Sequence, residues 1–144
     1  MRITEIRIKL IQRQPDKLRG FATVTVEDSL VVRDLKIIEG TSGLFVAMPS
    51  RKLMDRCQHC GGKNHLRARY CNDCGKRLKE VRGNADERGR PRLYADVAHP
   101  INQESRDFFQ GLVIEAYENE FERSKQEGYV AATFDDMDYE YYDA

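Results

Sequence analysis

In Ala22-Thr23-Val24-Thr25-Val26, apolar and small polar side chains alternate with the two-residue period of a β-strand, which is the clearest indication of the fold. The run Ile6-Arg7-Ile8-Lys9-Leu10 before it alternates in the same way. Two further apolar runs follow, residues 30–38, which are interrupted at Arg33-Asp34, and residues 44–48. Four such runs in succession favour an antiparallel meander with one face exposed to water.

A helix is predicted after these strands. Asn102, two residues after Pro100, is a good N-cap residue, and the amphipathic helix that begins after it should end near Gly128. Its apolar positions recur at steps of three and four: Phe109, Leu112, Val113, Ala116, Tyr117 and Phe121. The segment of residues 93–98 is short enough to form a fifth strand before the helix. The chain is therefore predicted to be α+β, with a small twisted antiparallel sheet covered by a C-terminal amphipathic helix.

All four cysteines lie in two matched segments, Cys57-Gln58-His59-Cys60-Gly61 and Cys71-Asn72-Asp73-Cys74-Gly75, with ten residues between Cys60 and Cys71. A CxxC turn presents two thiolates to one centre, and the glycine after each pair lets the backbone amides turn back toward the sulfurs. The pattern predicts one structural zinc ion bound by Cys57, Cys60, Cys71 and Cys74. Four protein ligands would leave no coordination position for a catalytic water.

Other uses of these cysteines fit less well. Disulfides need an oxidising compartment, yet Arg2, Arg7 and Lys9 are scattered through the first ten residues, which offer no signal-peptide core. A redox CxxC pair usually occurs once, next to a βαβ pattern. His59 and His65 could each replace one cysteine ligand, although the paired spacing makes an all-cysteine site simpler.

Charge is segregated along the chain although the formal net charge is zero. Residues 1–100 carry nine more basic than acidic residues, and residues 101–144 carry nine more acidic than basic ones. Most of the basic excess lies in residues 51–92, which hold 13 Lys and Arg against 5 Asp and Glu. Many charged runs are only solvated surface, but this block is where a polyanion would bind.

The 144 residues correspond to one domain of ordinary size with a small appendage, and no run approaches the roughly 18 apolar residues of a membrane span. We therefore expect a cytoplasmic protein. The main domain is predicted in residues 1–52 and 93–128, with an inserted metal-binding module and loop in residues 53–92, of which residues 82–91 look like a flexible return loop. Residues 129–144 are acidic and tyrosine-rich, which predicts a disordered tail; their charge also suggests a mimic of nucleic acid that folds over the basic block.

Two segments carry a family resemblance. They are Gly43-Leu44-Phe45-Val46-Ala47-Met48-Pro49-Ser50-Arg51-Lys52, preceded by Val31-Val32-Arg33-Asp34, and Asp96-Val97-Ala98-His99-Pro100-Ile101-Asn102, followed by the helix through Glu115-Ala116-Tyr117. In these segments the chain resembles the SpoVG family, bacterial proteins named for a stage of sporulation and described as nucleic-acid-binding regulators. The resemblance implies a twisted antiparallel sheet, a helix packed against it, and a homodimer formed through sheet edges.

The chain departs from that family between the two segments. Typical members have a short hairpin there, whereas this chain has residues 53–92, and we expect a rigid zinc-ribbon-like hairpin that leaves the core undisturbed. The resemblance implies nucleic-acid contacts by basic residues that match Arg51, Lys52 and Arg106. Asp107-Phe108 departs from the family pattern on the early helix, so contacts are expected to shift to the inserted module.

These observations predict a DNA- or RNA-binding regulator rather than an enzyme. Basic residues cluster on or beside the predicted hairpin, where Tyr70 can stack on a base: Arg67, Arg69, Lys76, Arg77 and Lys79. One alternative is a protein-interaction adaptor whose zinc module docks an acidic partner protein, and another is a module that staples a dimer. His99 is expected to hydrogen-bond the backbone beside Pro100 rather than act in catalysis, because no recognisable nucleophile motif, phosphate loop or carboxylate pair accompanies it.

Overall fold

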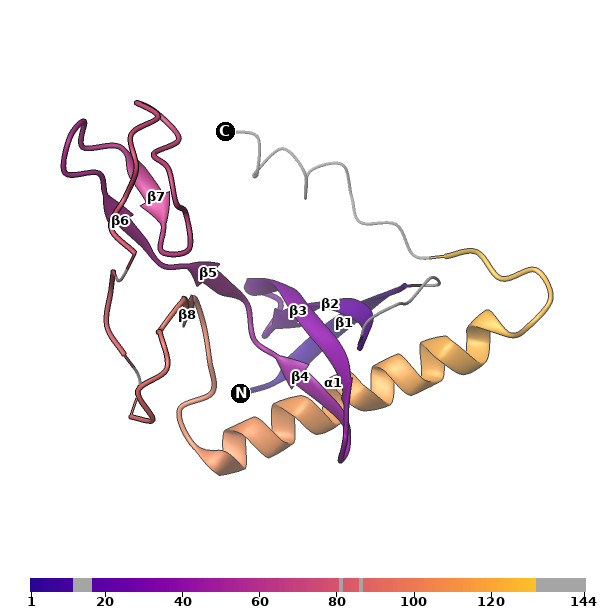
Figure 1. Cartoon of the computed structure of the whole chain (residues 1–144). Coiled ribbons are helices and arrows are strands. Elements are labelled where there is room, and N and C mark those ends of the chain that lie inside the picture. Colours follow the sequence, from indigo (N-terminus) through magenta and orange to yellow (C-terminus); the bar gives the residue numbers. More distant parts are fainter. Residues whose placement is uncertain (12–16, 81, 86, 132–144) are drawn as a thin grey trace. The chain divides into compact units, whose positions relative to one another are not determined.

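The computed structural model describes residues 1–11, 17–80, 82–85 and 87–131, and it divides into two compact units. The first unit consists of Met1–Pro49 together with the described residues from Ala98 onward, and the second is Ser50–Val97. Strands β1 to β4 and helix α1 belong to the first unit, and β5 to β8 to the second (Figure 1). Most of the predicted acidic tail, residues 132–144, lies outside the described residues.

The first unit contains a four-stranded antiparallel sheet with the order β1-β2-β3-β4. Its strands are β1 (Ile3–Leu10), β2 (Leu18–Val26), β3 (Leu30–Gly40) and β4 (Gly43–Ala47). Each strand pairs with the next one along the chain, as when Ile8 lies opposite Ala22 and Ile37 opposite Val46. The predicted meander and the α+β class are confirmed.

Strand β3 contains a bulge where its apolar pattern is interrupted. Val32 lies opposite Val24, but Leu35 lies opposite Ala22, so Arg33-Asp34 occupies the space of one residue on β2. The second bulge residue adopts a positive φ of 62°. A bulge of this kind shifts the phase of the side-chain alternation. Val32 and Leu35 therefore both pack in the core although they are three residues apart.

Helix α1 (Gln103–Ser124) packs on one face of this sheet. Asn102 caps it, because its Oδ1 accepts a hydrogen bond of 2.7 Å from the backbone N–H of Ser105. The helix buries Phe109, Val113 and Tyr117. Their partners in the core come from all four strands: Ile8, Ala22, Val24, Leu35, Ile37 and Val46.

The buried stripe of α1 is narrower than its apolar pattern suggests. Phe108 is 47% exposed and Phe121 is 43% exposed, the latter stacked on Tyr117 with 6.1 Å between ring centroids. The helix ends at Ser124, before the predicted stop at Gly128. In the described part of the chain, no helix is both long and apolar enough to cross a membrane.

The second unit is built from two short strand pairs. Strand β5 (Ser50–Lys52) pairs with β8 (Tyr94–Asp96), and β6 (Met54–Arg56) pairs with β7 (Lys63–His65) as the inserted hairpin. The fifth strand predicted in residues 93–98 is thus present, but it pairs with β5 and not with the four-stranded sheet. Because this pair falls within the second unit, that unit is a few residues wider at each end than the predicted module, residues 53–92.

Candidate metal centre and basic surface

The two CxxC segments form turns of the same construction. The N–H of Gly61 donates to the carbonyl oxygen of Cys57 at 2.9 Å, and the N–H of Gly75 donates to that of Cys71 at 3.0 Å. Both glycines adopt a left-handed backbone, with φ of 79° and 77°. This region favours glycine because a Cβ atom would be strained there. Each turn therefore needs the glycine that follows its second cysteine.

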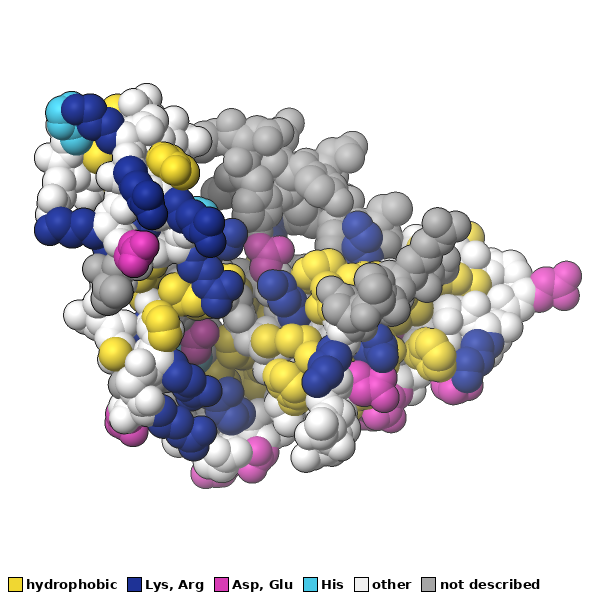
Figure 2. Space-filling model, in the orientation of Figure 1, with side chains coloured by type: hydrophobic (Ala, Val, Ile, Leu, Met, Phe, Trp, Pro, Cys, Tyr) yellow, Lys and Arg dark blue, Asp and Glu magenta, His cyan; other side chains and the backbone are white. Residues whose placement is uncertain are grey.

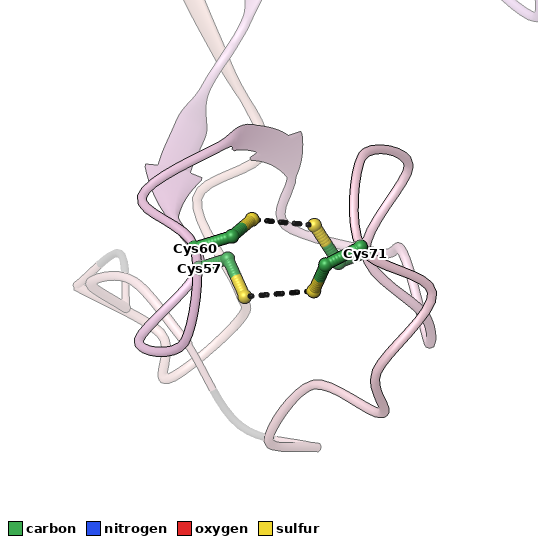
Figure 3. Close-up of side chains that lie close together, drawn as sticks. Cys57, Cys60 and Cys71 are labelled. Atoms are coloured by element: carbon green, nitrogen blue, oxygen red, sulfur yellow. Dashed lines mark hydrogen bonds between the residues drawn. The ribbon is translucent and has the colours of Figure 1, made fainter.

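The four sulfurs of these turns converge on one point between them (Figure 3). Cys57 Sγ lies 3.8 Å from Cys74 Sγ, and Cys60 Sγ lies 3.5 Å from Cys71 Sγ. All four sulfurs lie within 4.8 Å of one another. Four thiolates around a tetrahedral zinc ion, with bonds of about 2.3 Å, would be about 3.8 Å apart. The sulfur cluster therefore fits a tetrahedral metal ion with four cysteine ligands.

Backbone amides point at three of the sulfurs. The N–H groups of His59, Gly62 and Asp73 donate to Cys57, Cys60 and Cys71, respectively, each over 3.4 Å. Such donors stabilise thiolate charge around a metal ion. Gly62 also lies so close to Asp73 that a Cβ there would meet its Oδ2 at 2.2 Å. A side chain at position 62 would therefore require the Asp73 side chain to move.

Asn64 on β7 contacts a sulfur from outside the cluster. It is 3% exposed, and its Nδ2 donates to Cys71 Sγ at 3.4 Å. Its Oδ1 accepts a hydrogen bond of 2.8 Å from the N–H of Asn72. One side chain therefore connects the hairpin to the second turn and orients a metal-binding sulfur. The sequence pattern did not indicate this role, because an Asn between strand residues carries no distinguishing signal.

The surroundings of Cys71 and Cys60 shift the pKa values of these two thiols in opposite directions. The pKa of Cys71 is lowered to about 6, first by the backbone N–H of Cys74 and then by the side chain of Asn64. At Cys60 the Gly62 N–H acts to lower the pKa, but the neighbouring sulfurs and burial raise it to about 12. Adjacent thiolates repel one another, so the cluster needs a cation to carry four negative charges.

Replacement of Asn64 by Ala is expected to lower the affinity for Zn²⁺ by roughly 10- to 100-fold, because Cys71 loses its side-chain donor. Competition with a chromophoric chelator would measure this. Asn72→Ala is the matched control, since the contact between these residues uses the Asn72 backbone N–H, which the substitution keeps. Equal zinc affinity in both variants would contradict the role of Asn64.

The two histidines beside the cysteines have other contacts. Lys76 Nζ lies 3.3 Å from His59 Nδ1, and His65 Nδ1 accepts a hydrogen bond of 3.2 Å from the backbone N–H of Arg67. Among the described residues, the sulfur cluster contains cysteines alone. The all-cysteine site is therefore the arrangement that the structure favours over replacement of a cysteine by histidine.

Arg82 ties the segment after the second turn to the hairpin. Its side chain is 8% exposed, and its Nη1 pairs with Asp55 Oδ1 on β6 at 2.7 Å. Its Nη2 donates to the carbonyl oxygens of His65 and Ala68 at 3.0 and 2.7 Å. The start of the predicted flexible return loop is thus anchored. Nothing in the sequence distinguishes this arginine from the exposed basic residues around it.

The structure brings several predicted basic residues together in the second unit, where Lys and Arg side chains gather over the part that carries β6 and β7 (Figure 2). Arg67, Arg69 and Arg77 line a cavity of about 690 Å³, which we call the basic cavity. Lys76 and Arg77 line an adjoining hollow of about 330 Å³. Lys52 shares a third hollow, of about 120 Å³, with Arg67.

Four other predicted residues have simpler positions. Arg51 is exposed on β5, and Arg106 is exposed on α1, in the other unit. Tyr70 is 60% exposed, so its ring is open to solvent. His99 Nδ1 lies 3.0 Å from the carbonyl oxygen of Pro100, which is the backbone contact expected for it.

Comparison with known proteins gives a consistent family match. The SpoVG family model matches residues 1–119, which include β1 to β8 and most of α1. The septation protein SpoVG of Lachnospira eligens is 36% identical over 118 residues, which cover 82% of this chain and 92% of that protein. The protein of the same name from Clostridium beijerinckii is 34% identical over 128 residues, covering 89% and 100%. That of Bdellovibrio bacteriovorus is 34% identical over 120 residues, covering 83% and 76%.

Proposed function

We propose, because this chain belongs to the SpoVG family, that it is a regulatory protein without enzymatic activity that binds DNA or RNA and carries one structural zinc ion. The relatives' name points to septation as the regulated process. The observation that supports nucleic-acid binding best is the basic cavity of the second unit, lined by Arg67, Arg69 and Arg77.

Zinc is the metal that suits the sulfur cluster. Thiolates are soft ligands, and a tetrahedral set of four of them is typical of Zn²⁺ in small structural modules. Four sulfurs within 4.8 Å of one another match this set. The proposed role is structural, since the sulfurs of Cys57, Cys60, Cys71 and Cys74 fill the tetrahedral coordination sphere.

Nucleic-acid binding is supported by basic side chains that have no acidic partner. Among the described residues, the side chains of Arg67, Arg69 and Lys79 form no ion pair, and Arg77 is paired with Glu80 only at 3.6 Å. Arginine guanidinium groups bind phosphate oxygens in bidentate fashion. An exposed tyrosine, Tyr70, adds an aromatic face on which a base can stack.

A homodimer is part of the proposal. Within the described residues, β1 and β4 are the edge strands of the sheet. On β4 the backbone N–H of Val46 already donates to Gln110 Oε1 at 3.2 Å, so β1 is the more open edge on which a second copy could add a strand. Phe108 is 47% exposed on α1 and offers an apolar contact for the same partner. Two copies would double the basic surface and raise affinity for a long polyanion by avidity.

Charge reversal tests the binding function. Substitution of Arg67, Arg69, Lys76 and Arg77 by Glu is expected to weaken binding to single-stranded RNA, single-stranded DNA and duplex DNA by at least about 100-fold at low salt, because phosphate contacts become repulsive. In the unmodified protein, log affinity should fall with log salt concentration with a slope of about −0.9 per phosphate contacted on duplex and about −0.7 on single strands. Fluorescence anisotropy with labelled oligonucleotides would measure both.

The matched control reverses four exposed basic residues that line none of the three hollows, namely Arg2, Lys36, Lys63 and Arg92. It changes the net charge equally and should retain most of the binding. An equal loss of nucleic-acid affinity in both variants would show that binding depends on net charge and not on the residues that line the hollows. Weak binding that neither variant alters would favour the alternative, an adaptor whose zinc module docks a partner protein.

A further inference from the structure

We propose that the basic cavity binds an unpaired segment of nucleic acid, with a base against its apolar wall and phosphates on the arginines around it. This inference rests on the proposed nucleic-acid binding and adds to it a preference for single strands. The cavity volume of about 690 Å³ lies within the range of roughly 300–1,000 Å³ that is typical of sites for small organic ligands.

Part of the cavity lining is apolar, and this apolar wall comes from three separate stretches of chain. Leu66 follows β7, Leu78 follows the second cysteine turn, and Pro91 and Leu93 belong to the returning segment. The returning segment passes so close to the wall that a Cβ on Gly83 would meet Leu66 Cδ1 at 2.7 Å. These side chains offer a surface on which the flat, weakly polar face of a base can be buried.

Hydrogen bonds within this unit hold the walls in place. The backbone N–H of Leu78 donates to the carbonyl oxygen of Arg69 at 2.7 Å, which connects the two sides of the second turn. Arg82, itself a lining residue, bonds the carbonyl oxygens of His65 and Ala68. A site held in this way needs little rearrangement when a ligand enters.

The basic side chains that line the same cavity suit a ligand with several phosphates. Arg67, Arg69 and Lys79 have no acidic partner among the described residues, and Glu80 is the one carboxylate among the lining residues. A single anion would leave most of these cations unused, whereas successive phosphates of one strand can each meet a cation.

The combination of an apolar wall and free cations favours a single strand over a duplex. In a duplex the bases are stacked and paired, so only backbone and groove edges would reach the wall and its apolar surface would gain nothing. In a single strand a base can turn outward and cover that wall while the flanking phosphates contact the arginines. The apolar wall therefore favours single strands over duplexes, whereas the cations strengthen binding of both forms.

The test uses the zinc-loaded full-length chain and oligonucleotides of about 12 nucleotides, a length in the range bound by single-strand-binding folds. Leu78→Gln keeps the charge and approximate size of the side chain but makes the wall polar. It is expected to weaken binding of single-stranded RNA and DNA by roughly three- to tenfold and to leave duplex binding unchanged. Arg67→Ala with Arg69→Ala should weaken binding of all three.

Lys63→Ala with Arg92→Ala is the matched control, because these exposed residues belong to the same unit and do not line the cavity. It should lower all three affinities by the same small factor. Zinc content and thermal unfolding would establish whether Leu78→Gln is folded; if it is not, Leu93→Gln tests another apolar residue of the lining.

The possible failures are distinguishable. If Leu78→Gln and Leu93→Gln change single-strand and duplex binding equally, or change neither, the cavity is not a base site, although nucleic-acid binding stands. If the unmodified chain binds none of the three nucleic acids at low salt, both the inference and the proposed function are wrong.

Discussion

Removal of the metal is expected to unfold Ser50–Val97 and to leave the sheet and helix of the first unit folded. In the second unit, the described residues that are buried are Cys57, Asn64 and Cys71, two of which are metal-binding cysteines. So little buried apolar surface does not offset the conformational entropy of ordering this chain. Structural zinc supplies about 10–16 kcal/mol in isolated zinc-finger peptides, which is enough to make folding of such a module depend on the metal.

Amide NMR spectra recorded with zinc and after chelation would show this effect residue by residue. Signals from residues 50–97 should collapse to the narrow range of an unfolded chain, while those of β1 to β4 and α1 stay dispersed. Cys71→Ser should reproduce the collapse in the presence of zinc, whereas His59→Ala should not, because His59 lies in the same turn region but outside the sulfur cluster. Dispersed signals from residues 50–97 in metal-free protein would contradict a structural role for the metal.

Substitution of Phe109 by Ala is expected to reduce the free energy of unfolding of the first unit by about 3–5 kcal/mol. Phe109 is 6% exposed and packs in the same core as Val113 of α1 and Leu35 and Ile37 of the sheet, so its loss would leave a cavity between the helix and the strands. A typical domain is stable by only about 5–15 kcal/mol, and this variant would therefore be close to unfolding.

Denaturant titration of zinc-loaded protein, followed by circular dichroism, would measure this change. Phe108→Ala is a close control, because it removes the same atoms from the neighbouring position of the same helix, where the ring is 47% exposed. Its effect should stay below about 1 kcal/mol. Similar losses at the two positions would mean that α1 does not pack on the sheet through Phe109.

The features that depend on local patterns could be predicted from the sequence. Two-residue alternation and apolar runs indicated the strands of the sheet, Asn102 marked the start of α1, and the matched CxxC spacing indicated the sulfur cluster. These predictions succeeded because strand periodicity, helix capping and metal-ligand spacing are properties of neighbouring residues.

The features that depend on partners distant in sequence could not be predicted and are visible in the folded structure alone. It paired the predicted fifth strand, β8, with β5 instead of the main sheet, and it gave Arg82 an ion pair with Asp55 that leaves the arginine side chain 8% exposed. It also assembled the basic cavity from the segments on either side of the second cysteine turn and from the returning segment. Neither burial nor strand pairing is encoded in a residue's neighbours, since both depend on which segments the folded backbone brings into contact.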